Sequence, residues 1–210
     1  MTLSDIQRDD LDWAKGDGLL PAVIQHAREG RVLMLGYMNK ASLDHTLETG
    51  KVTFYSRSKQ RLWTKGETSG NILELVSIKS DCDNDTLLVQ AIPHGPTCHT
   101  GSQTCFGNSM QPAIGLLAEL EDVIQSRADE NNRSSYTSKL LNDGVPRCAQ
   151  KVGEEGVEVA LAAVQGHRDE LHQEAADLLY HLLVCLRSAE SSLDDVLRVL
   201  ESRRRQEDSE

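Results

Sequence analysis

The hydrophobic positions in the first half of the chain fall in short runs rich in Val, Ile, Leu and Thr, separated by polar stretches. This is the pattern of β-strands. Strands are expected at residues 21–27, 31–38, 52–57, 71–80 and 86–93. In the fourth run Ile72, Val76 and Ile78 are predicted to lie on one face, interrupted only by Glu74. The first half is therefore predicted to be α+β, with strands dominant.

Helical spacing is expected once in the first half and throughout the second. In the first half, Asn39 suits the N-cap of a helix and Gly50 suits its stop. In the second half, Pro146 suits the first turn of a helix that Gly166 ends, and a short helix is expected at residues 136–141. Three further apolar stripes recur every three or four residues: Ile114, Leu117, Leu120 and Ile124; Leu171, Leu178, Leu179, Leu182, Leu183 and Leu186; and Leu193, Val196, Leu197 and Leu200.

The two periodicities meet at residues 106–112, a stretch rich in Gly, Asn, Ser and Pro. We therefore expect two domains, at residues 1–113 and 114–210, the second an all-α helical bundle. A chain of 210 residues is long enough for two domains that each bury a core. No internal repeat is found.

Charge and composition narrow the function. The net charge of −11 argues against a nucleic-acid partner. It is uneven, with −2 over residues 1–107 and −9 over residues 108–210, so the second half can bind a polyphosphate only through a divalent cation. No apolar run approaches the roughly 20 residues that cross a bilayer, and the opening residues do not resemble a signal peptide. A cytoplasmic protein with five reduced cysteines and no membrane partner is expected.

Metal-ligand types cluster between residues 81 and 105. Asp81, Asp83 and Asp85 surround Cys82, and Cys98, His99 and Cys105 follow. Buried or incidental cysteines are the alternative, since free Cys is often buried. Three thiolates with one open position are typical of a catalytic zinc, which would lower the pKa of a bound water and supply hydroxide. The aspartates are harder ligands that suit Mg²⁺.

The segments at 81–85 and 98–105, together with FYSRS at 54–58 and WTKGETSGN at 63–71, resemble the phosphoribosyl-AMP cyclohydrolase family over residues 10–108. That family opens the adenine ring of phosphoribosyl-AMP in histidine biosynthesis. The resemblance implies zinc on Cys82, Cys98 and Cys105, and Mg²⁺ on the three aspartates. It also implies an intertwined homodimer in which Cys82 faces Cys98 and Cys105 of the partner subunit.

The same resemblance suggests roles for the remaining motif residues. His99 is either a general base or proton shuttle, or only a hydrogen-bonding neighbour of the zinc ligands. Phosphate groups of the substrate are assigned to Arg57, Lys65 and the loop from Gly66 to Gly70. Further substrate contacts are assigned to Trp63, Glu67 and Ser69.

A second cluster, of carboxylates, lies on two predicted helices. Glu155 and Glu158 are three residues apart, as are Glu174 and Asp177, so each pair shares a helix face. Glu154 and Glu158, four residues apart, are a second adjacent pair. An acidic solvent-facing surface is the alternative. Because like charges at this spacing destabilise a helix, a cation site is favoured, and oxygen ligands select Mg²⁺ or Mn²⁺.

The ExxE and ExxD pairs, with YTSKLL at 136–141 and KVGEEGVE at 151–158, resemble the MazG-type pyrophosphohydrolases, specifically the phosphoribosyl-ATP branch, over residues 113–202. The resemblance implies Mg²⁺ bridging a triphosphate while water attacks the α-phosphorus and pyrophosphate leaves. Glu154 or Glu155 would orient that water, with the choice open. Lys139 and Lys151 would meet phosphate oxygens. His181 is either a neighbour of the ligands or a core or capping residue.

Together the two resemblances predict a bifunctional hydrolase that uses Zn²⁺ and Mg²⁺ in consecutive steps of histidine biosynthesis. One alternative is a general nucleoside-triphosphate pyrophosphatase with a zinc-stabilised N-terminal module. Another is a metal-sensing nucleotide-binding protein in which both clusters are structural. A cytidine-type zinc deaminase is disfavoured, because its HxE…PCxxC pattern does not occur.

Overall fold

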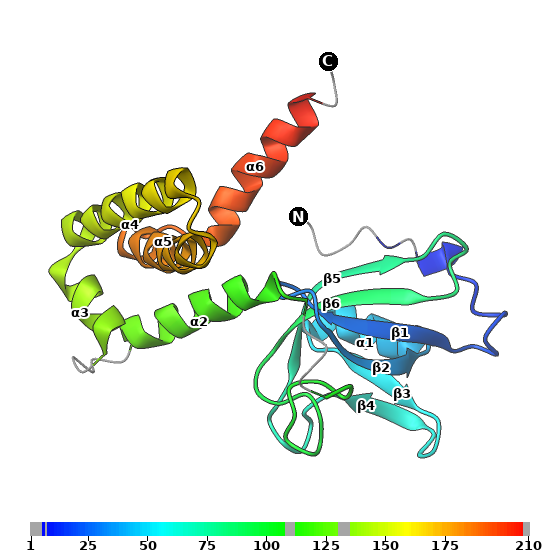
Figure 1. Cartoon of the computed structure of the whole chain (residues 1–210). Coiled ribbons are helices and arrows are strands. Elements are labelled where there is room, and N and C mark those ends of the chain that lie inside the picture. The colour runs from blue at the N-terminus through cyan, green and yellow to red at the C-terminus, as the bar shows by residue number, and fades with distance from the viewer. Residues whose placement is uncertain (1–5, 7, 108–111, 130–134, 208–210) are drawn as a thin grey trace. The chain divides into compact units, whose positions relative to one another are not determined.

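The computed structural model describes residue 6 and residues 8–107, 112–129 and 135–207. The chain divides into two compact units, Met1–Leu116 and Leu117–Glu210. Figure 1 colours the chain by residue number, from blue at the N-terminus to red at the C-terminus. Part of the predicted junction, residues 108–111, lies outside the described residues. No helix in the described ranges has the length and apolar character needed to span a bilayer.

The first unit is built on a four-stranded sheet in the order β2-β1-β6-β5. All neighbours are antiparallel except β1 and β6, which are parallel. Strands β3 and β4 form a separate antiparallel pair. Its elements are the short 3-10 helix Arg8–Asp10, β1 (Leu20–His26), β2 (Val32–Met38), α1 (Lys40–Thr49), β3 (Thr53–Ser56), β4 (Arg61–Thr64), β5 (Leu73–Ser80) and β6 (Leu87–Pro93).

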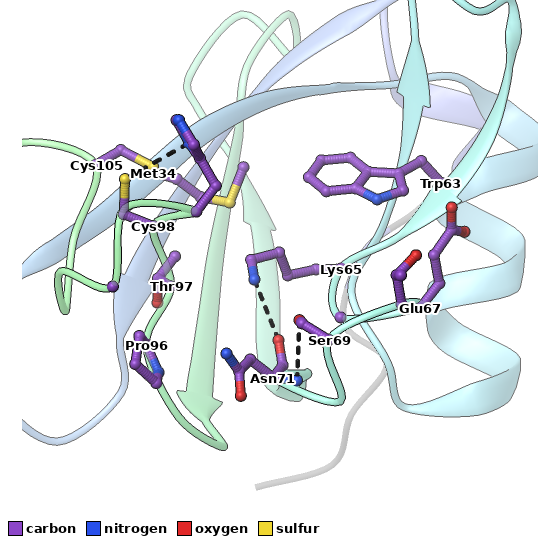
Figure 2. Close-up of a pocket in the computed structure, with 14 residues that line it drawn as sticks. Met34, Trp63, Lys65, Glu67, Ser69, Asn71, Pro96, Thr97, Cys98 and Cys105 are labelled. Carbon is purple, nitrogen blue, oxygen red and sulfur yellow. Dashed lines mark hydrogen bonds between the residues drawn. The ribbon is translucent and has the colours of Figure 1, made fainter.

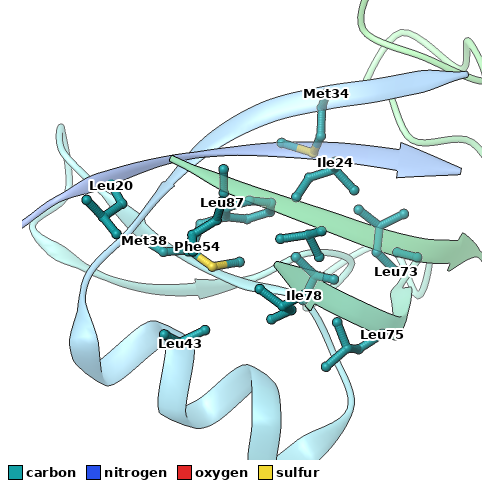
Figure 3. Packing of buried hydrophobic residues seen from close by; sticks show 14 of the residues in the cluster. Leu20, Ile24, Met34, Met38, Leu43, Phe54, Leu73, Leu75, Ile78 and Leu87 are labelled. Atoms are coloured by element: carbon teal, nitrogen blue, oxygen red, sulfur yellow. The ribbon is translucent and has the colours of Figure 1, made fainter. Parts of the chain in front are cut away.

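The core of the first unit lies between one face of this sheet and α1, as Figure 3 shows. Leu20, Ala22 and Ile24 alternate along β1 and are fully buried, as the period of a strand requires. Helix α1 begins where predicted, because the Asn39 side chain accepts from the backbone N–H of Ser42 at 2.9 Å. It ends at Gly50, whose φ of 67° is a left-handed conformation that suits glycine.

Two predictions for the strands were wrong. The face predicted from Ile72, Val76 and Ile78 does not form, because a bulge between Leu75 and Ser77 shifts the register of β5. Leu75 and Ile78 are therefore both buried, whereas Val76 is 42% exposed. Strand β4 was missed because it is only four residues long and has no buried alternation.

The opposite face of the sheet carries apolar side chains that are not fully covered within one chain. Val23 pairs with Leu35 on β2 and with Leu88 on β6, so the three side chains form a row across the strands. Leu35 is 47% and Leu88 40% exposed. Such a row can be buried by another protein surface.

The second unit consists of helices, of which α4 and α5 form an antiparallel pair (Figure 1). Its elements are α2 (Gly115–Asp129), α3 (Tyr136–Asp143), α4 (Val145–Gln165), α5 (Arg168–Ser188) and α6 (Leu193–Glu207). Gly166 ends α4 in a left-handed conformation, as predicted. The core of the second unit contains Ile124, Leu140, Cys148, Leu183 and Val184. The prediction of a strand-dominated α+β half followed by an all-α half is confirmed.

The apolar stripes predicted from the sequence do lie on helices, but several of their side chains are less buried than predicted. Ile114 precedes α2 and is 74% exposed, so the first stripe contributes mainly through Ile124. On α6, Leu197 and Leu200 are each about half exposed, while Leu193 packs against the core.

Candidate functional site

A cavity of about 420 Å³ opens in the first unit between the segment at residues 63–71 and the loop at residues 96–105, and Figure 2 shows its lining. Most residues predicted to act in ring opening lie on its wall. They are Trp63, Lys65, Gly66, Glu67, Ser69, Cys98, His99 and Cys105, joined by Met34, Thr68, Asn71, Pro96, Thr97 and Gly101.

The β3–β4 pair positions one side of this cavity. Phe54 is opposite Trp63 in the ladder, and their rings stack with centroids 5.5 Å apart. Because Phe54 is 1% exposed, it anchors the Trp63 ring from within the core. Past the end of β4 the chain turns at Gly66, where φ is 83° and a Cβ would lie 2.5 Å from the carbonyl oxygen of Asn71. Only glycine fits this turn without strain.

Lys65 is a buried cation in the cavity wall. The residue is 8% exposed, and its Nζ donates to the carbonyl oxygen of Asn71 at 3.2 Å. Burial lowers the pKa of the Lys65 ammonium, and negative charge on Cys105 and Cys98 partly offsets that effect. Lys65 is therefore close enough to the thiols to interact with them electrostatically.

The two thiols on the opposite wall differ in their acidity. The Thr100 hydroxyl donates to Cys98 Sγ at 3.1 Å and lowers the pKa of that thiol. Burial raises the pKa of the Cys105 thiol, and the neighbouring Cys98 thiolate raises it further. His99 Nδ1 lies 3.8 Å from Cys98 Sγ. The loop is tied to β2, because the Cys105 N–H donates to the carbonyl oxygen of Leu33 at 2.8 Å.

The predicted aspartate cluster forms at the turn between β5 and β6. Asp81, Asp83 and Asp85 each place a carboxylate oxygen within 4.8 Å of the others. Asp81 Oδ1 accepts from the backbone N–H groups of Asp85 and Thr86, which fixes the turn. Lys15 Nζ pairs with Asp83 at 2.6 Å and also with Asp85, so its ammonium offsets one of the three negative charges. These contacts raise the pKa of Lys15 and lower that of Asp85.

Cys82 and Arg57 do not join the cavity within one chain. Cys82 is exposed at the aspartate turn, and across the described residues it belongs to no close group of metal-ligating side chains with Cys98 and Cys105. The Arg57 guanidinium stacks on the Tyr37 ring, 3.8 Å from its centroid, and Arg57 is not among the lining residues.

In the second unit, α4 and α5 bring together Glu155, Glu158 and Glu174, each with an oxygen within 4.8 Å of the others. Glu155 is 4% exposed. Lys151 Nζ lies 2.6 Å from Glu155 Oε1, and this contact is the main reason that the pKa of Glu155 is lowered. The pKa of Glu174 is raised, first by partial burial and then by the charge of Glu158. The trio carries negative charge that a cation would stabilise.

The other predicted residues of the second unit lie around this trio. Asp177 is exposed and outside the close group, although its charge contributes to raising the pKa of Glu174. Glu154 pairs with Lys151 at 2.9 Å and accepts from Gln150 at 2.7 Å. Lys139 is exposed on α3.

Two structural partners were not predicted from the sequence. Lys15 lies far along the chain from the aspartates that it pairs with, and a solitary lysine in a polar segment carries no signal of that pairing. The Tyr136 hydroxyl lies 3.1 Å from His181 Nε2, and His181 Nδ1 is 3.5 Å from Glu155 Oε1. His181 is 5% exposed and lies beside a ligand candidate, which agrees both with a neighbour of the ligands and with a core residue, so both options stay open.

Comparisons with known proteins cover both units. The phosphoribosyl-AMP cyclohydrolase family model matches residues 34–107, and the phosphoribosyl-ATP pyrophosphohydrolase family model matches residues 117–204. The histidine biosynthesis bifunctional protein HisIE of Escherichia coli (strain K12) is 57% identical over 201 residues, covering 96% of this chain and 98% of that protein. The chain belongs to the bifunctional HisIE family.

Two further HisIE proteins are similar to this chain over nearly its whole length. That of Salmonella typhimurium is 56% identical over 96% of this chain and 98% of its own length. That of Photobacterium profundum is 57% identical over 92% of this chain and 96% of its own. The two family matches and these relatives show that the chain has phosphoribosyl-AMP cyclohydrolase and phosphoribosyl-ATP pyrophosphohydrolase activities. This confirms the predicted bifunctional enzyme over the general pyrophosphatase and the non-enzymatic binding protein.

Proposed function

We propose that the two activities divide between the two units, ring opening in residues 1–113 and pyrophosphate release in residues 114–210. The observation that carries this division is the chemistry of the two sites. Thiols and a buried lysine line the cavity of the first unit, whereas α4 and α5 bring together the carboxylates of Glu155, Glu158 and Glu174. The helical unit acts first, because its product, phosphoribosyl-AMP, is the substrate of the other unit.

The donor set of the first cavity fits zinc. Cys98 and Cys105 interact with each other on one wall, and the lowering of the Cys98 pKa favours the thiolate that a soft cation binds. Cys82 would complete the three ligands. When bound, zinc would lower the pKa of a water toward neutrality, so that hydroxide is available to attack C6 of the adenine.

The remaining lining residues bind and orient the substrate. Trp63 offers a ring face on which the adenine can stack, and the buried Lys65 offers positive charge to a phosphate or to negative charge that develops on the ring. Gly66, Glu67 and Ser69 form the rim of the same cavity. His99, adjacent to Cys98, is placed to move a proton between the attacking water and N1 of the opening ring. Arg57 is assigned to a substrate phosphate at the edge of the site.

We propose that the active form is a homodimer. Within one chain Cys82 is not gathered with the other two cysteines, so a second copy must supply it if all three hold one zinc. The exposed apolar row of Val23, Leu35 and Leu88 is a surface that such a copy can cover. Each zinc would then take Cys82 from one chain and Cys98 and Cys105 from the other.

Magnesium fits both clusters of acidic residues, the aspartates of the first unit and the glutamates of the second. At the first, Asp81, Asp83 and Asp85 already hold the ammonium of Lys15, which Mg²⁺ would displace. At the second, Glu155, Glu158 and Glu174 would hold the ion, with Asp177 added on triphosphate binding. When bound, Mg²⁺ neutralises the triphosphate charge and orients it for attack at the α-phosphorus.

The residues around the helical site have distinct roles in this proposal. Glu155 belongs to the close carboxylate group and is assigned as a ligand. Glu154 lies outside it and remains the candidate to orient the attacking water. Lys151 pairs with both carboxylates and can turn to a phosphate once the ion neutralises them. Lys139 is assigned to the phosphates as an exposed cation on α3.

We place the enzyme in the cytoplasm, acting on small nucleotides rather than nucleic acid or membranes. The five cysteines are free thiols, as in a reducing compartment, and the charge of −11 disfavours a polyanion.

The division of labour is tested with phosphoribosyl-ATP, Mg²⁺ and Zn²⁺, following pyrophosphate release and ring opening separately. Cys105→Ala should abolish ring opening and leave pyrophosphate release at the wild-type rate. Glu158→Ala should reduce pyrophosphate release by at least about 100-fold, and ring opening of added phosphoribosyl-AMP should persist. If each substitution stopped both reactions in a folded protein, the assignment of one activity to each unit would be wrong.

A further inference from the structure

A chain of close polar contacts runs from Tyr136 on α3, through His181, to Glu155 in the carboxylate group of the helical unit. Tyr136 Oη lies 3.1 Å from His181 Nε2. On the other side of the ring, His181 Nδ1 lies 2.9 Å from the carbonyl oxygen of Asp177 and 3.5 Å from Glu155 Oε1. His181 and Glu155 are 5% and 4% exposed. The His181–Glu155 end of the chain is therefore largely shielded from water, whereas Tyr136 on α3 is 53% exposed.

The partners of His181 determine its tautomer. A carbonyl oxygen can only accept, so Nδ1 must carry the hydrogen that is directed at Asp177 and, more distantly, at Glu155. In the neutral imidazole Nε2 is then the acceptor, and the Tyr136 hydroxyl donates to it. Tyr136 thereby supports the tautomer that the Asp177 carbonyl requires, in which the Nδ1–H lies on the side of the ring that faces Glu155.

The contacts to Glu155 are directed at one of its two oxygens. Lys151 Nζ and His181 Nδ1 both approach Oε1, at 2.6 and 3.5 Å. With Oε1 held in this way, Oε2 is left for a cation shared with Glu158 and Glu174. A carboxylate that is held by a fixed donor loses less conformational entropy when it binds an ion.

We propose that Tyr136 and His181 are positioning residues for the magnesium site, acting through Glu155. This inference rests on the proposed role of Glu155 as a ligand. Neither residue needs to touch the substrate or the ion. Their effect is to fix the rotamer of Glu155 and the direction of its free oxygen before the ion arrives.

The chain contains a matched control for this proposal. Tyr180 belongs to the same ring cluster, with its ring centroid 6.4 Å from that of Tyr136 and 5.0 Å from that of His181. Its hydroxyl, however, bonds Thr137 Oγ1 at 2.9 Å. Tyr136→Phe and Tyr180→Phe each remove one hydroxyl from the same cluster, but only the first removes a donor from the chain to Glu155.

The first experiment measures Mn²⁺ binding to the full-length protein by electron paramagnetic resonance, with Glu158→Gln as the reference that lacks the helical site. Tyr136→Phe should weaken the Glu158-dependent binding by roughly three- to tenfold, the worth of one hydrogen bond. Tyr180→Phe should remain within about twofold of wild type. Equal weakening by both substitutions would overturn the proposal, since it would indicate general loosening of the cluster.

The second experiment varies His181 and separates the two ring nitrogens. His181→Asn can place an N–H where Nδ1 is, whereas His181→Gln places its amide nearer to Nε2 and His181→Leu has no donor. We expect the Mg²⁺ concentration for half-maximal pyrophosphate release to rise about tenfold or more for Leu and Gln. For Asn it should rise by less than about threefold. Ring opening of added phosphoribosyl-AMP, and circular dichroism, should be unchanged in all three.

The outcomes distinguish this inference from the proposed function. If wild type and Glu158→Gln bind Mn²⁺ equally, the helical metal site itself is refuted. If they differ but the Asn and Leu variants of His181 behave alike, the site stands and the positioning role is refuted.

Discussion

At the scale of single residues, the helical site depends on carboxylates whose acidities are moved in opposite directions. Lys151 lowers the pKa of Glu155, which therefore stays ionised well below neutrality. For Glu174 the two largest influences are burial and the charge of Glu158, and both raise its pKa above the ordinary value of 4.5. Glu174 therefore takes up a proton before Glu155 does as the pH falls.

This difference predicts the pH dependence of metal binding. Only the ionised trio can hold Mg²⁺. As the pH is lowered, Glu174 takes up a proton through its raised pKa, so the affinity for Mg²⁺ should begin to fall before the pH reaches 4.5. The apparent Mg²⁺ affinity, measured by pyrophosphate release between pH 5 and 8, should decline toward the acid end. In Glu174→Gln the affinity should be weaker at pH 8 and this part of the pH dependence absent.

The same shift has a consequence for stability. A raised carboxyl pKa contributes stability that is present below 4.5 and is lost as the pH rises through the folded value. Metal-free Glu174→Gln should therefore melt above metal-free wild type at pH 8, and added Mg²⁺ should raise the melting temperature of wild type more than that of the variant. A lower melting temperature for the metal-free variant would contradict this sign.

At the scale of elements, β2 and the β3–β4 pair meet at a glycine. A Cβ on Gly36 would lie 2.3 Å from Cδ1 of Phe54, a buried ring that also supports Trp63. Strand β2 can therefore lie against Phe54 only because residue 36 has no side chain. The packing of one strand thus fixes the wall of the ring-opening cavity.

Gly36→Ala should destabilise the first unit by about 1–3 kcal/mol, because a well-packed core resists an added methyl group. Ring opening should fall with it as Trp63 shifts, while pyrophosphate release is retained. Gly153→Ala is the contrasting substitution, since nothing lies within 4 Å of its Cβ on α4. There alanine should stabilise by about 0.5–1 kcal/mol through helix propensity. Urea unfolding followed by tryptophan fluorescence and by helical circular dichroism separates the two.

Sequence periodicity predicted elements better than it predicted their faces. The caps at Asn39, Gly50 and Gly166 are local, and all three were confirmed. The face of β5 was wrong, because the bulge after Leu75 depends on pairing with β6 and leaves no mark in the alternation. The α6 stripe was assigned correctly as helical, but about half of the area of Leu197 and Leu200 is exposed, because burial also needs a partner.

At the scale of the whole molecule, the proposed homodimer makes each zinc site depend on two chains. Cys82→Ala and Cys105→Ala proteins should each lack ring opening. When they are unfolded together and refolded as a mixture, half of the dimers should be mixed, and each mixed dimer should contain one intact site. Ring opening should then return to about a quarter of the wild-type value.

This complementation has a clear control. A mixture of Cys98→Ala and Cys105→Ala should stay inactive, since both ligands belong to the same chain in the proposed site. Pyrophosphate release should be unaffected in every mixture. Recovery in the control, or none in the test mixture despite confirmed exchange of subunits, would refute the shared site.

Features that depend on neighbours along the chain could be predicted from the sequence. The change from strand to helix spacing, the helix caps, the one-face pairing of Glu155 with Glu158 and the thiol and aspartate motifs are all local, and family membership confirmed the activities that the motifs indicated. The packing of the elements decided which residues far apart in the sequence come into contact. Packing placed Lys15 on Asp83 and Asp85, left Asp177 outside the close trio, and joined Tyr136 to Glu155 through His181. A helical period gives the face of a residue, but the partner on the facing element depends on how the elements pack, and no local pattern records that.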